Sequence, residues 1–336
     1  MKDLITIGMP VYNVEKHIGK ALLSVLNQTY DNIEFIVVDD KGRDNSMGIV
    51  RSIIANHPRG KEVRIIEHPQ NIGTGAGRNS AIEFSTGKYI FFMDSDDEMA
   101  PDCIKILHDK MQEKPVDFII ASMSARDRTG IIIEELIYED TLIEGNKDVV
   151  CNYYMTPKRH VAMWNKLYDL SFLRSNNIKC FPTHLNEDNL FTFKVILNAR
   201  SCRYISDITY YYYDTPNSTV KAASNHKISD RFAQQYVECI DFKKKYIQNY
   251  ADISKKEFVY RYIIFQTIHY TLLIKQSDLL NNKEKSAYIK KLIKFPFDIS
   301  EIKRMRNKLF FYVMYMVYSV PFTITCFKLI RRVSFP

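Results

Sequence analysis

The six cysteines of this 336-residue chain include no pair at C-x-x-C spacing, and no histidine cluster accompanies them. Their pattern argues against a zinc site and against a disulfide framework. Reduced, buried thiols in a cytosolic protein are the expected state. The first residues, MKDLITIGMPVYN, also lack an apolar run long enough for a secretory signal peptide. We expect them to form a strand that Pro10 ends.

The glycines do not form a classical dinucleotide-binding loop. Gly73, Gly75 and Gly77 precede Arg78, but their spacing is not G-x-G-x-x-G, and they follow the third predicted strand rather than the first. Small residues followed by an arginine at a helix start still suit the close approach of a diphosphate.

Acidic residues are scarce in the last third of the chain. Residues 221–336 hold 22 Lys and Arg against 9 Asp and Glu, a net charge of +13, whereas residues 1–220 carry −5. A basic region of this kind indicates an anionic partner, either membrane lipid or nucleic acid. Its basic residues are interleaved with apolar ones and form no recognisable motif, which disfavours nucleic acid.

Charge is absent from residues 309–327, LFFYVMYMVYSVPFTITCF, and basic residues flank this run on both sides. Its length approaches the ~20 apolar residues of a membrane span, but Pro321 and several hydroxyl side chains weaken that interpretation. A helix in the membrane interface fits better, with Lys and Arg at the lipid headgroups. A C-terminal helix docked on the globular body is the alternative.

The first 120 residues alternate short apolar runs with amphipathic segments, which predicts a parallel sheet covered by helices on both faces. The expected strands are Leu4–Met9, Glu34–Val38, Val63–Glu67, Tyr89–Met93 and Asp117–Ala121, and the expected helices are Glu15–Asn27, Asp44–Asn56, Thr74–Ser85 and Pro101–Glu113. Further along we expect strands at 131–138 and 203–213, and helices at 187–198 and near 225–249, 254–276 and 280–294.

Polar loops follow four of these strands. They begin with Pro10-Val11-Tyr12-Asn13, Asp39-Asp40, His68-Pro69-Gln70-Asn71 and Asp94-Ser95-Asp96-Asp97. Ligands bind beyond the carboxyl ends of strands in such sheets. Three carboxylates held together repel one another, and a hard divalent cation such as Mg²⁺ or Mn²⁺ relieves that repulsion. The last loop therefore predicts a metal–diphosphate site, and a solvated acidic turn that caps the next helix is the alternative.

Two other segments of the chain contain candidate catalytic or sugar-binding residues. Glu187 and Asp188 open a predicted helix, where a carboxylate beside an acceptor hydroxyl could be a general base. Acidic residues in a first turn can also simply complement the helix dipole. Trp164, the only tryptophan, could stack on a sugar ring or fill the core.

Taken in order, these segments resemble a known family. The succession P-V-Y-N, S-V-L-N-Q-T-Y, V-V-D-D, N-x-G with R-N, D-S-D-D, W-N-K-L-Y and E-D, over residues 4–215, closely resembles the family 2 glycosyltransferases of the GT-A fold. The resemblance implies an α/β, Rossmann-like, mostly parallel mixed sheet with helices on both faces, followed here by a helical C-terminal extension. It also implies an inverting transferase that uses a nucleotide-diphospho-sugar, most often a UDP-sugar, with Mg²⁺ or Mn²⁺. A Q-x-x-R-W motif is missing, which argues against a processive synthase.

Carried over position by position, the resemblance implies a role for each motif. Asp188 is the implied catalytic base, and Glu187 helps to position it or the acceptor. Asp96 and Asp97 are the implied metal ligands. The implied donor-binding residues are Pro10, Val11, Tyr12, Asn13, Asp39, Asp40, Arg78, Asp94, Ser95 and Trp164.

The sequence departs from the family pattern at two places. The usual D-D-G-S-x-D loop is here D-D-K-G-R-D, which adds Lys41 and Arg43 beside the nucleotide. The usual A-R-N is here G-R-N. Both changes leave the fold intact and leave the donor preference open.

We therefore expect a glycosyltransferase domain at 1–220, a helical extension at 221–300, and a basic, apolar segment at 301–336 that associates with the membrane. The expected enzyme is cytoplasmic, peripheral on the inner face of the cell membrane, and transfers a sugar to a glycan or lipid-linked acceptor in surface polysaccharide biosynthesis. A metal-dependent nucleotidyltransferase and a non-catalytic nucleotide-binding module are the alternatives. The first lacks a Gly-rich, Lys-containing signature near the N-terminus, and the second would not need Asp96, Asp97 and Asp188 to be intact.

Overall fold

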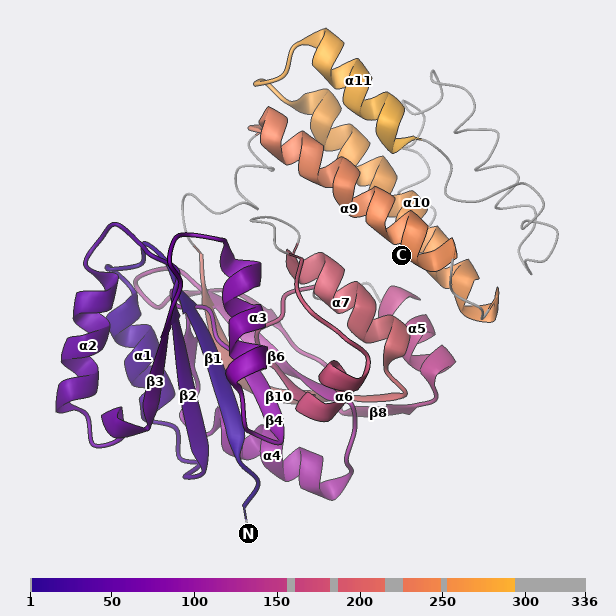
Figure 1. Cartoon of the computed structure of the whole chain (residues 1–336). Coiled ribbons are helices and arrows are strands. Elements are labelled where there is room, and N and C mark those ends of the chain that lie inside the picture. Colours follow the sequence, from indigo (N-terminus) through magenta and orange to yellow (C-terminus); the bar gives the residue numbers. More distant parts are fainter. Residues whose placement is uncertain (1, 156–160, 182–186, 215–225, 249–252, 294–336) are drawn as a thin grey trace. The chain divides into compact units, whose positions relative to one another are not determined.

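The chain forms two compact units in the computed structural model (Figure 1), which describes residues 2–155, 161–181, 187–214, 226–248 and 253–293. The first unit comprises Met1–Val149 and His160–Thr215, and the second comprises Val150–Arg159 and Pro216–Pro336. Helix α5 (Asn146–Met155) begins in the first unit and continues into the second.

A ten-stranded mixed sheet forms the centre of the first unit. Its main order is β3-β2-β1-β4-β9-β6-β10-β5, with β7 paired to β6 and β8 paired to β10. Strands β1 to β4 are parallel to one another, as are β6 and β10, whereas β5, β7, β8 and β9 join antiparallel. The bounds are β1 Ile5–Val11, β2 Ile33–Asp39, β3 Val63–Glu67, β4 Tyr89–Phe92, β5 Glu98–Met99, β6 Phe118–Arg126, β7 Ile132–Leu136, β8 Thr141–Glu144, β9 Lys166–Asp169 and β10 Ser201–Tyr213. The predicted mixed, mostly parallel sheet is confirmed.

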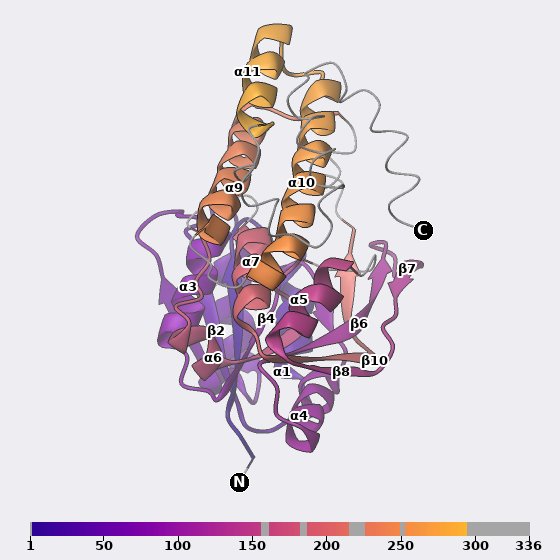
Figure 2. The same ribbon diagram turned by 90° about the vertical axis from the view of Figure 1, so that its right-hand side faces the viewer.

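Helices cover both faces of this sheet (Figures 1 and 2). The bounds are α1 Ile18–Leu26, α2 Ser46–Asn56, α3 Thr74–Phe84, α4 Cys103–Glu113, α6 Leu170–Ser175 and α7 Glu187–Asn198. Because strand side chains alternate between faces, Phe91 of β4 joins a core with Leu22 of α1 and Leu107 of α4. Its neighbour Phe92 points the other way and meets Phe191 of α7 edge-on, with ring centroids 5.9 Å apart.

Strand β1 continues past its predicted end, because it runs through Pro10 to Val11. Its pairing with β4 extends only as far as Gly8 opposite Phe92, while its pairing with β2 continues to Val11 opposite Asp39. A proline is tolerated where a strand has become an edge on one side, since the missing N–H then removes no ladder bond. The prediction that Pro10 ends the strand was therefore wrong by two residues.

The pairing register brings the candidate loops to one edge of the sheet. Val11 lies opposite Asp39, and Asp39 lies opposite Glu67. The carboxyl ends of β1, β2 and β3 therefore coincide, and β4 ends beside β1 after Phe92. The four polar loops singled out in the sequence all leave from this edge.

The second unit is helical in its described part. Helices α9 (Asp230–Gln248), α10 (Ile253–Gln276) and α11 (Asn282–Leu292) lie side by side (Figures 1 and 2). Tyr236 of α9 stacks on Tyr270 of α10 at 4.0 Å, and the buried Lys243 donates to Gln266 Oε1 at 2.7 Å. Within the described ranges, none of the helices combines the length and the apolar character that a membrane crossing requires. The apolar run at 309–327 lies outside the described residues.

Candidate active site

The loop after β4 holds its three carboxylates in three different environments. Asp94 accepts a 2.6 Å hydrogen bond from the guanidinium of Arg78. Asp97 is buried and accepts from the Tyr210 hydroxyl at 2.9 Å and from the backbone N–H of Tyr213 at 2.8 Å. Asp96 remains the most exposed of the three, and its carboxylate lies 3.8 Å from a guanidinium nitrogen of Arg128. Each of the three carboxylates thus has its own partner, which reduces the mutual repulsion expected from the sequence.

Burial of Asp97 favours the neutral form of its carboxyl. Burial raises the pKa of its carboxyl well above the usual range, and the neighbouring charges of Asp96 and Asp94 raise it further. The two hydrogen bonds from β10 oppose this shift. Tyr210 was not predicted from the sequence, because nothing local marks one tyrosine among the run at 210–213 as the partner of Asp97.

Arg78 connects the loop after β4 to the start of α7. Its guanidinium donates to Asp94 on one side and to Glu187 Oε1 at 3.0 Å on the other, and its side chain is only 4% exposed. Burial opposes its charge, but the two carboxylates outweigh that effect and hold the pKa of Arg78 above its ordinary value. This bridge brings together two acidic motifs that lie more than ninety residues apart in the chain.

Asp188 follows Glu187 in the first turn of α7. Burial, followed by the adjacent charge of Glu187, raises the pKa of its carboxyl to about 7, while Arg78 acts in the opposite direction. Its Oδ1 accepts a 2.6 Å hydrogen bond from the backbone N–H of Asn189. A carboxyl with a pKa near neutrality can accept a proton at physiological pH, which is the property that a general base needs.

Lys166 is a further titratable residue that the sequence did not single out. It is buried at the start of β9 and donates to the carbonyl of Ala162. Burial lowers the pKa of its ammonium to about 7, and the charge of Asp188 partly opposes this shift. A lysine inside the W-N-K-L-Y segment, beside Trp164 and Leu167, was the available signal.

The two carboxylates at the end of β2, Asp39 in the strand and Asp40 just after it, have different hydrogen-bond partners. Asp40 is buried and accepts four hydrogen bonds, from His68 Nδ1, the Asn71 amide and the backbone N–H groups of Ile72 and Gly73, at 2.7–3.0 Å. This carboxylate therefore shapes the loop between β3 and α3. Asp39 accepts from the backbone N–H of Lys41 at 2.8 Å with one oxygen and lies at the sheet edge.

The loop after β1 supports the loop after β2. Asn13 adopts a left-handed conformation, with φ +52°, and its side-chain oxygen accepts from the backbone N–H of Arg43 at 2.7 Å. Tyr12 beside it is 43% exposed. Pro10 and Val11, by contrast, are covered as part of β1. Of this segment, Tyr12 is thus the side chain that offers a ring surface to a ligand.

The glycines of α3 serve helix packing. A Cβ on Gly77 would lie 3.0 Å from the Cβ of Pro10, and one on Gly75 would lie 2.4 Å from the carbonyl oxygen of Phe181. A side chain at either position would therefore crowd Pro10 of β1 or the backbone of Phe181. The close approach holds Arg78 within reach of both Asp94 and Glu187.

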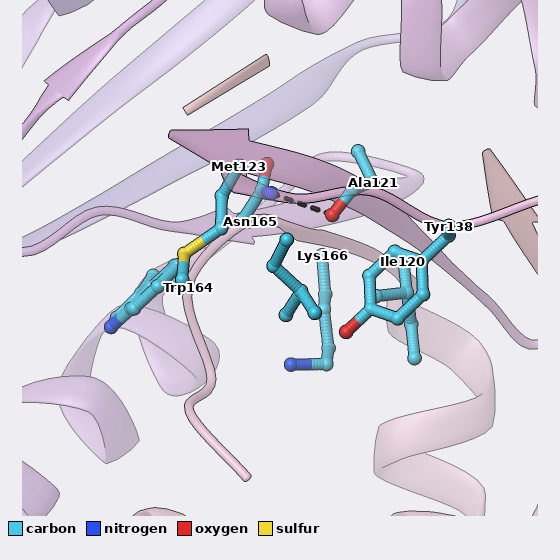
Figure 3. Close-up of a pocket in the computed structure, with 8 residues that line it drawn as sticks. Ile120, Ala121, Met123, Tyr138, Trp164, Asn165 and Lys166 are labelled. Carbon is cyan, nitrogen blue, oxygen red and sulfur yellow. Dashed lines mark hydrogen bonds between the residues drawn. The ribbon is translucent and has the colours of Figure 1, made fainter. Parts of the chain in front are cut away.

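Trp164 lies against β10 in a parallel stack. Its ring centroid is 4.5 Å from that of Tyr210 and 5.7 Å from that of Tyr212, with nearly parallel planes. The indole is buried, which matches the core use that the sequence left open. It also lines a small pocket together with Tyr138 and Lys166, in which the Asn165 amide is hydrogen bonded to Ala121 (Figure 3).

The residues after β4 are compatible with a cation that takes few protein ligands. Within the part of the chain that the structure describes, no group of three or more His, Cys, Asp or Glu side chains is arranged to hold a metal ion. Asp97 already accepts hydrogen bonds on both oxygens, and Asp94 is paired with Arg78. Mg²⁺ commonly uses one or two carboxylates and completes its shell with phosphate oxygens and water. Asp96 fits that arrangement best.

The sequence matches known glycosyltransferases over its first unit. Residues 6–148 match the model of glycosyl transferase family 2. A poly(ribitol-phosphate) beta-glucosyltransferase of Bacillus spizizenii is 32% identical over 216 residues, covering 62% of this chain and 32% of that protein. Across three curated relatives, the match covers 60%, 32% and 30% of their length, so the chain corresponds to a part of each.

Solved structures agree on the fold. The TarS 1–349 fragment of S. aureus in complex with UDP-GlcNAc superposes with a TM-score of 0.68 at 22% identity, covering 89% of this chain and 83% of that one. A mannosyltransferase of Pyrobaculum calidifontis, in complex with GDP-Man and Mn2+, superposes with a TM-score of 0.53 at 14% identity, covering 98% and 88%. The chain therefore carries a family 2 glycosyltransferase domain with the GT-A fold.

Proposed function

We propose that the protein is an inverting glycosyltransferase that moves a sugar from a nucleotide-diphospho-sugar, most simply a UDP-sugar, to a hydroxyl of a glycan or lipid-linked acceptor. One observation carries the proposal. The Arg78 bridge joins Asp94 of the loop after β4 to Glu187, next to Asp188, whose pKa of about 7 suits a general base. A donor loop and a proton acceptor at one sheet edge are the two parts that a single displacement needs.

In the proposed reaction, Asp188 removes the proton from the acceptor hydroxyl as its oxygen attacks the anomeric carbon. The new carbon–oxygen bond forms on the face opposite the leaving group, and the bond to the β-phosphate oxygen breaks with its electron pair going to the nucleoside diphosphate. One displacement inverts the configuration and requires no covalent enzyme intermediate. The charge that develops on the sugar is oxocarbenium-like, as in glycoside hydrolysis.

The donor would lie along the edge formed by the loops after β1, β2 and β4. Tyr12 and Asp39 face the nucleobase in this proposal, with Pro10, Val11, Asn13 and Asp40 shaping the pocket behind them. Asp94 and Ser95 would contact ribose or sugar. Asp96, with Asp97 behind it, would hold Mg²⁺ or Mn²⁺, which neutralises charge on the leaving diphosphate. The Mn2+ in the mannosyltransferase of similar fold supports this choice.

A donor screen tests the proposed activity. We expect the purified chain with Mn²⁺ to release UDP slowly from at least one UDP-sugar, because water can attack the anomeric carbon in place of the missing acceptor hydroxyl. UDP-, GDP- and dTDP-sugars are compared by measuring the released nucleotide. Release from none of the UDP-sugars, with release from a GDP- or dTDP-sugar, would contradict the UDP assignment. Release of pyrophosphate from a nucleoside triphosphate would instead favour a nucleotidyltransferase.

We further propose that the enzyme acts in surface polysaccharide biosynthesis as a peripheral protein on the cytoplasmic side of the membrane. The poly(ribitol-phosphate) transferase among its relatives and the net charge of +13 in residues 221–336 support this role. Removing 303–336 is expected to move the protein from the membrane fraction to the soluble fraction, because both the apolar run and its flanking cations are lost. Equal partitioning of the full and shortened chains would favour a docked C-terminal segment.

A further inference from the structure

The hairpin between β6 and β7 brings a second arginine to the loop after β4. Its turn is held by Asp127, whose Oδ1 accepts from the backbone N–H groups of Thr129 at 2.8 Å and Ile131 at 3.0 Å. Gly130 completes the turn with φ +94°, a conformation that favours glycine. Figure 2 shows β7 beside β6 at this end of the sheet. The turn thus presents Arg128 from an ordered position.

Arg128 contacts the most exposed carboxylate of the loop. One guanidinium nitrogen donates to the Asp96 carbonyl at 2.8 Å, and another lies 3.8 Å from the Asp96 carboxylate. The guanidinium also lies over the Tyr213 ring, 5.3 Å from its centroid. The backbone carbonyl and the ring thus hold the guanidinium beside the loop, while its contact with the Asp96 carboxylate is longer than a direct hydrogen bond.

The two arginines of this site differ in how accessible they are. The Arg78 side chain is 4% exposed and bridges two carboxylates, whereas the side chains of Arg128 and Asp96 are 29% and 35% exposed. A ligand that reaches the loop from solvent therefore meets Arg128 and Asp96 first. Arginine suits this position because its planar donor fork matches phosphate oxygens.

We infer that Arg128 is a diphosphate-binding residue that neutralises Asp96 until the donor and its cation arrive. This inference rests on the proposed function. A divalent cation and the guanidinium compete for the same carboxylate, so Arg128 disfavours the cation when it comes alone. When a nucleoside diphosphate accompanies the cation, the guanidinium exchanges Asp96 for phosphate oxygens. Arg128 therefore couples cation binding to donor binding.

Replacing Arg128 by Gln separates this role from a structural one, because we expect the affinities for Mn²⁺ and for UDP to change in opposite directions. Mn²⁺ alone is expected to bind R128Q up to about tenfold more tightly, since a repelling charge has been removed. UDP in saturating Mn²⁺ is expected to bind about 10- to 100-fold more weakly, the usual loss for a charge-assisted hydrogen bond. Electron paramagnetic resonance of free Mn²⁺ and calorimetric titration of UDP measure the two affinities on the full chain.

Arg126 provides a matched control two residues away on β6. Its guanidinium lies 3.6 Å from the centroid of the Tyr211 ring, so R126Q removes the same charge from the same hairpin, at the last residue of β6, without removing the contact to Asp96. We expect R126Q to bind Mn²⁺ and UDP like the wild type. R128K should keep the Mn²⁺ affinity of the wild type and show a smaller loss for UDP, because lysine retains the charge without the planar fork.

Three results would overturn the inference. R128Q could bind UDP as tightly as the wild type, R128Q could weaken Mn²⁺ and UDP together, or R126Q could reproduce the changes of R128Q. A wild-type protein that binds no UDP in the presence of Mn²⁺ would instead refute the proposed use of a UDP-sugar, and the role of Arg128 with it.

Discussion

Replacement of Asp188 by Asn is expected to lower sugar transfer by a factor of about 10² to 10⁴, the usual contribution of a positioned general base. The amide has nearly the same shape as the carboxyl but cannot accept the proton of the acceptor hydroxyl. UDP binding in the presence of Mn²⁺ should change little, because the proposed donor contacts lie on the loops after β1, β2 and β4. Transfer rates and calorimetric UDP affinities of the two proteins provide the comparison.

The pH dependence of the wild-type activity tests the same assignment independently. A general base acts in its deprotonated form, and burial raises the pKa of Asp188 to about 7. The value of kcat/KM should therefore rise with pH through about 7 and level off above it. The Glu187 charge is part of the cause, so E187Q should shift this limb to lower pH. A limb that stays in place in E187Q would assign the ionisation to another group.

The melting temperature of D188N at pH 8 checks that the variant folds. A carboxyl whose pKa is higher in the folded than in the unfolded protein stabilises the fold at low pH, and that contribution is lost as pH rises through the folded value. Asn carries no buried charge above pH 7, so the melting temperature of D188N at pH 8 should equal or exceed that of the wild type. Full transfer activity in a folded D188N protein would exclude Asp188 as the base.

Replacement of Arg78 by Met is the second change with a large expected effect. The side chain keeps most of its volume, but Asp94 and Glu187 lose the cation that lies between them at 2.6 and 3.0 Å. Removing one partner of a buried ion pair leaves an uncompensated charge, and we expect a loss of about 3 kcal/mol in the free energy of unfolding. The rate of sugar transfer should also fall, by more than the loss of folded protein explains, because the turn that carries Asp188 loses its link to the donor loop.

A surface arginine provides the comparison for this variant. Arg51 pairs with Glu67 at 2.7 Å, but both side chains are about half exposed. Screening by water makes such pairs weak, so R51M should unfold at nearly the urea concentration of the wild type. R78K is the second variant, since lysine keeps the charge but cannot span both carboxylates with two separate nitrogens. If R78M unfolded at the urea concentration of the wild type and transferred sugar at the wild-type rate, the Arg78 bridge would have no role in stability or in activity.

Much of the fold could be predicted from local patterns. The expected helices and strands of the first 120 residues agree with the observed ones to within a few residues, because buried parallel strands and amphipathic helices leave clear periodicities. Strand β9 (Lys166–Asp169) was missed. It has four residues, and its position between β4 and β6 depends on partners 46 and more residues away. No local period encodes such a pairing.

The candidate site could be predicted in part. Its acidic motifs are visible in the sequence, but their individual partners are not. Asp40 illustrates the limit, since the donors that occupy its carboxylate come from His68 and the loop before α3. The hydrogen bonds from β10 to Asp97 and the contact of Arg128 with Asp96 are likewise made by distant segments. Side-chain partners of this kind follow from the packing of elements and not from spacing along the chain.

The sequence by itself determined the alternation of strands and helices and the edge from which the polar loops leave, because periodicity and the geometry of parallel sheets are sufficient for both. It also made Asp94, Asp96 and Asp188 candidate site residues, through the family resemblance of the motifs that contain them. Only the tertiary structure decided which carboxylate is bridged, which is buried and which is accessible. Those properties depend on desolvation and on charges brought within a few ångströms by the packing of α3, α7 and β10 against one another and the sheet.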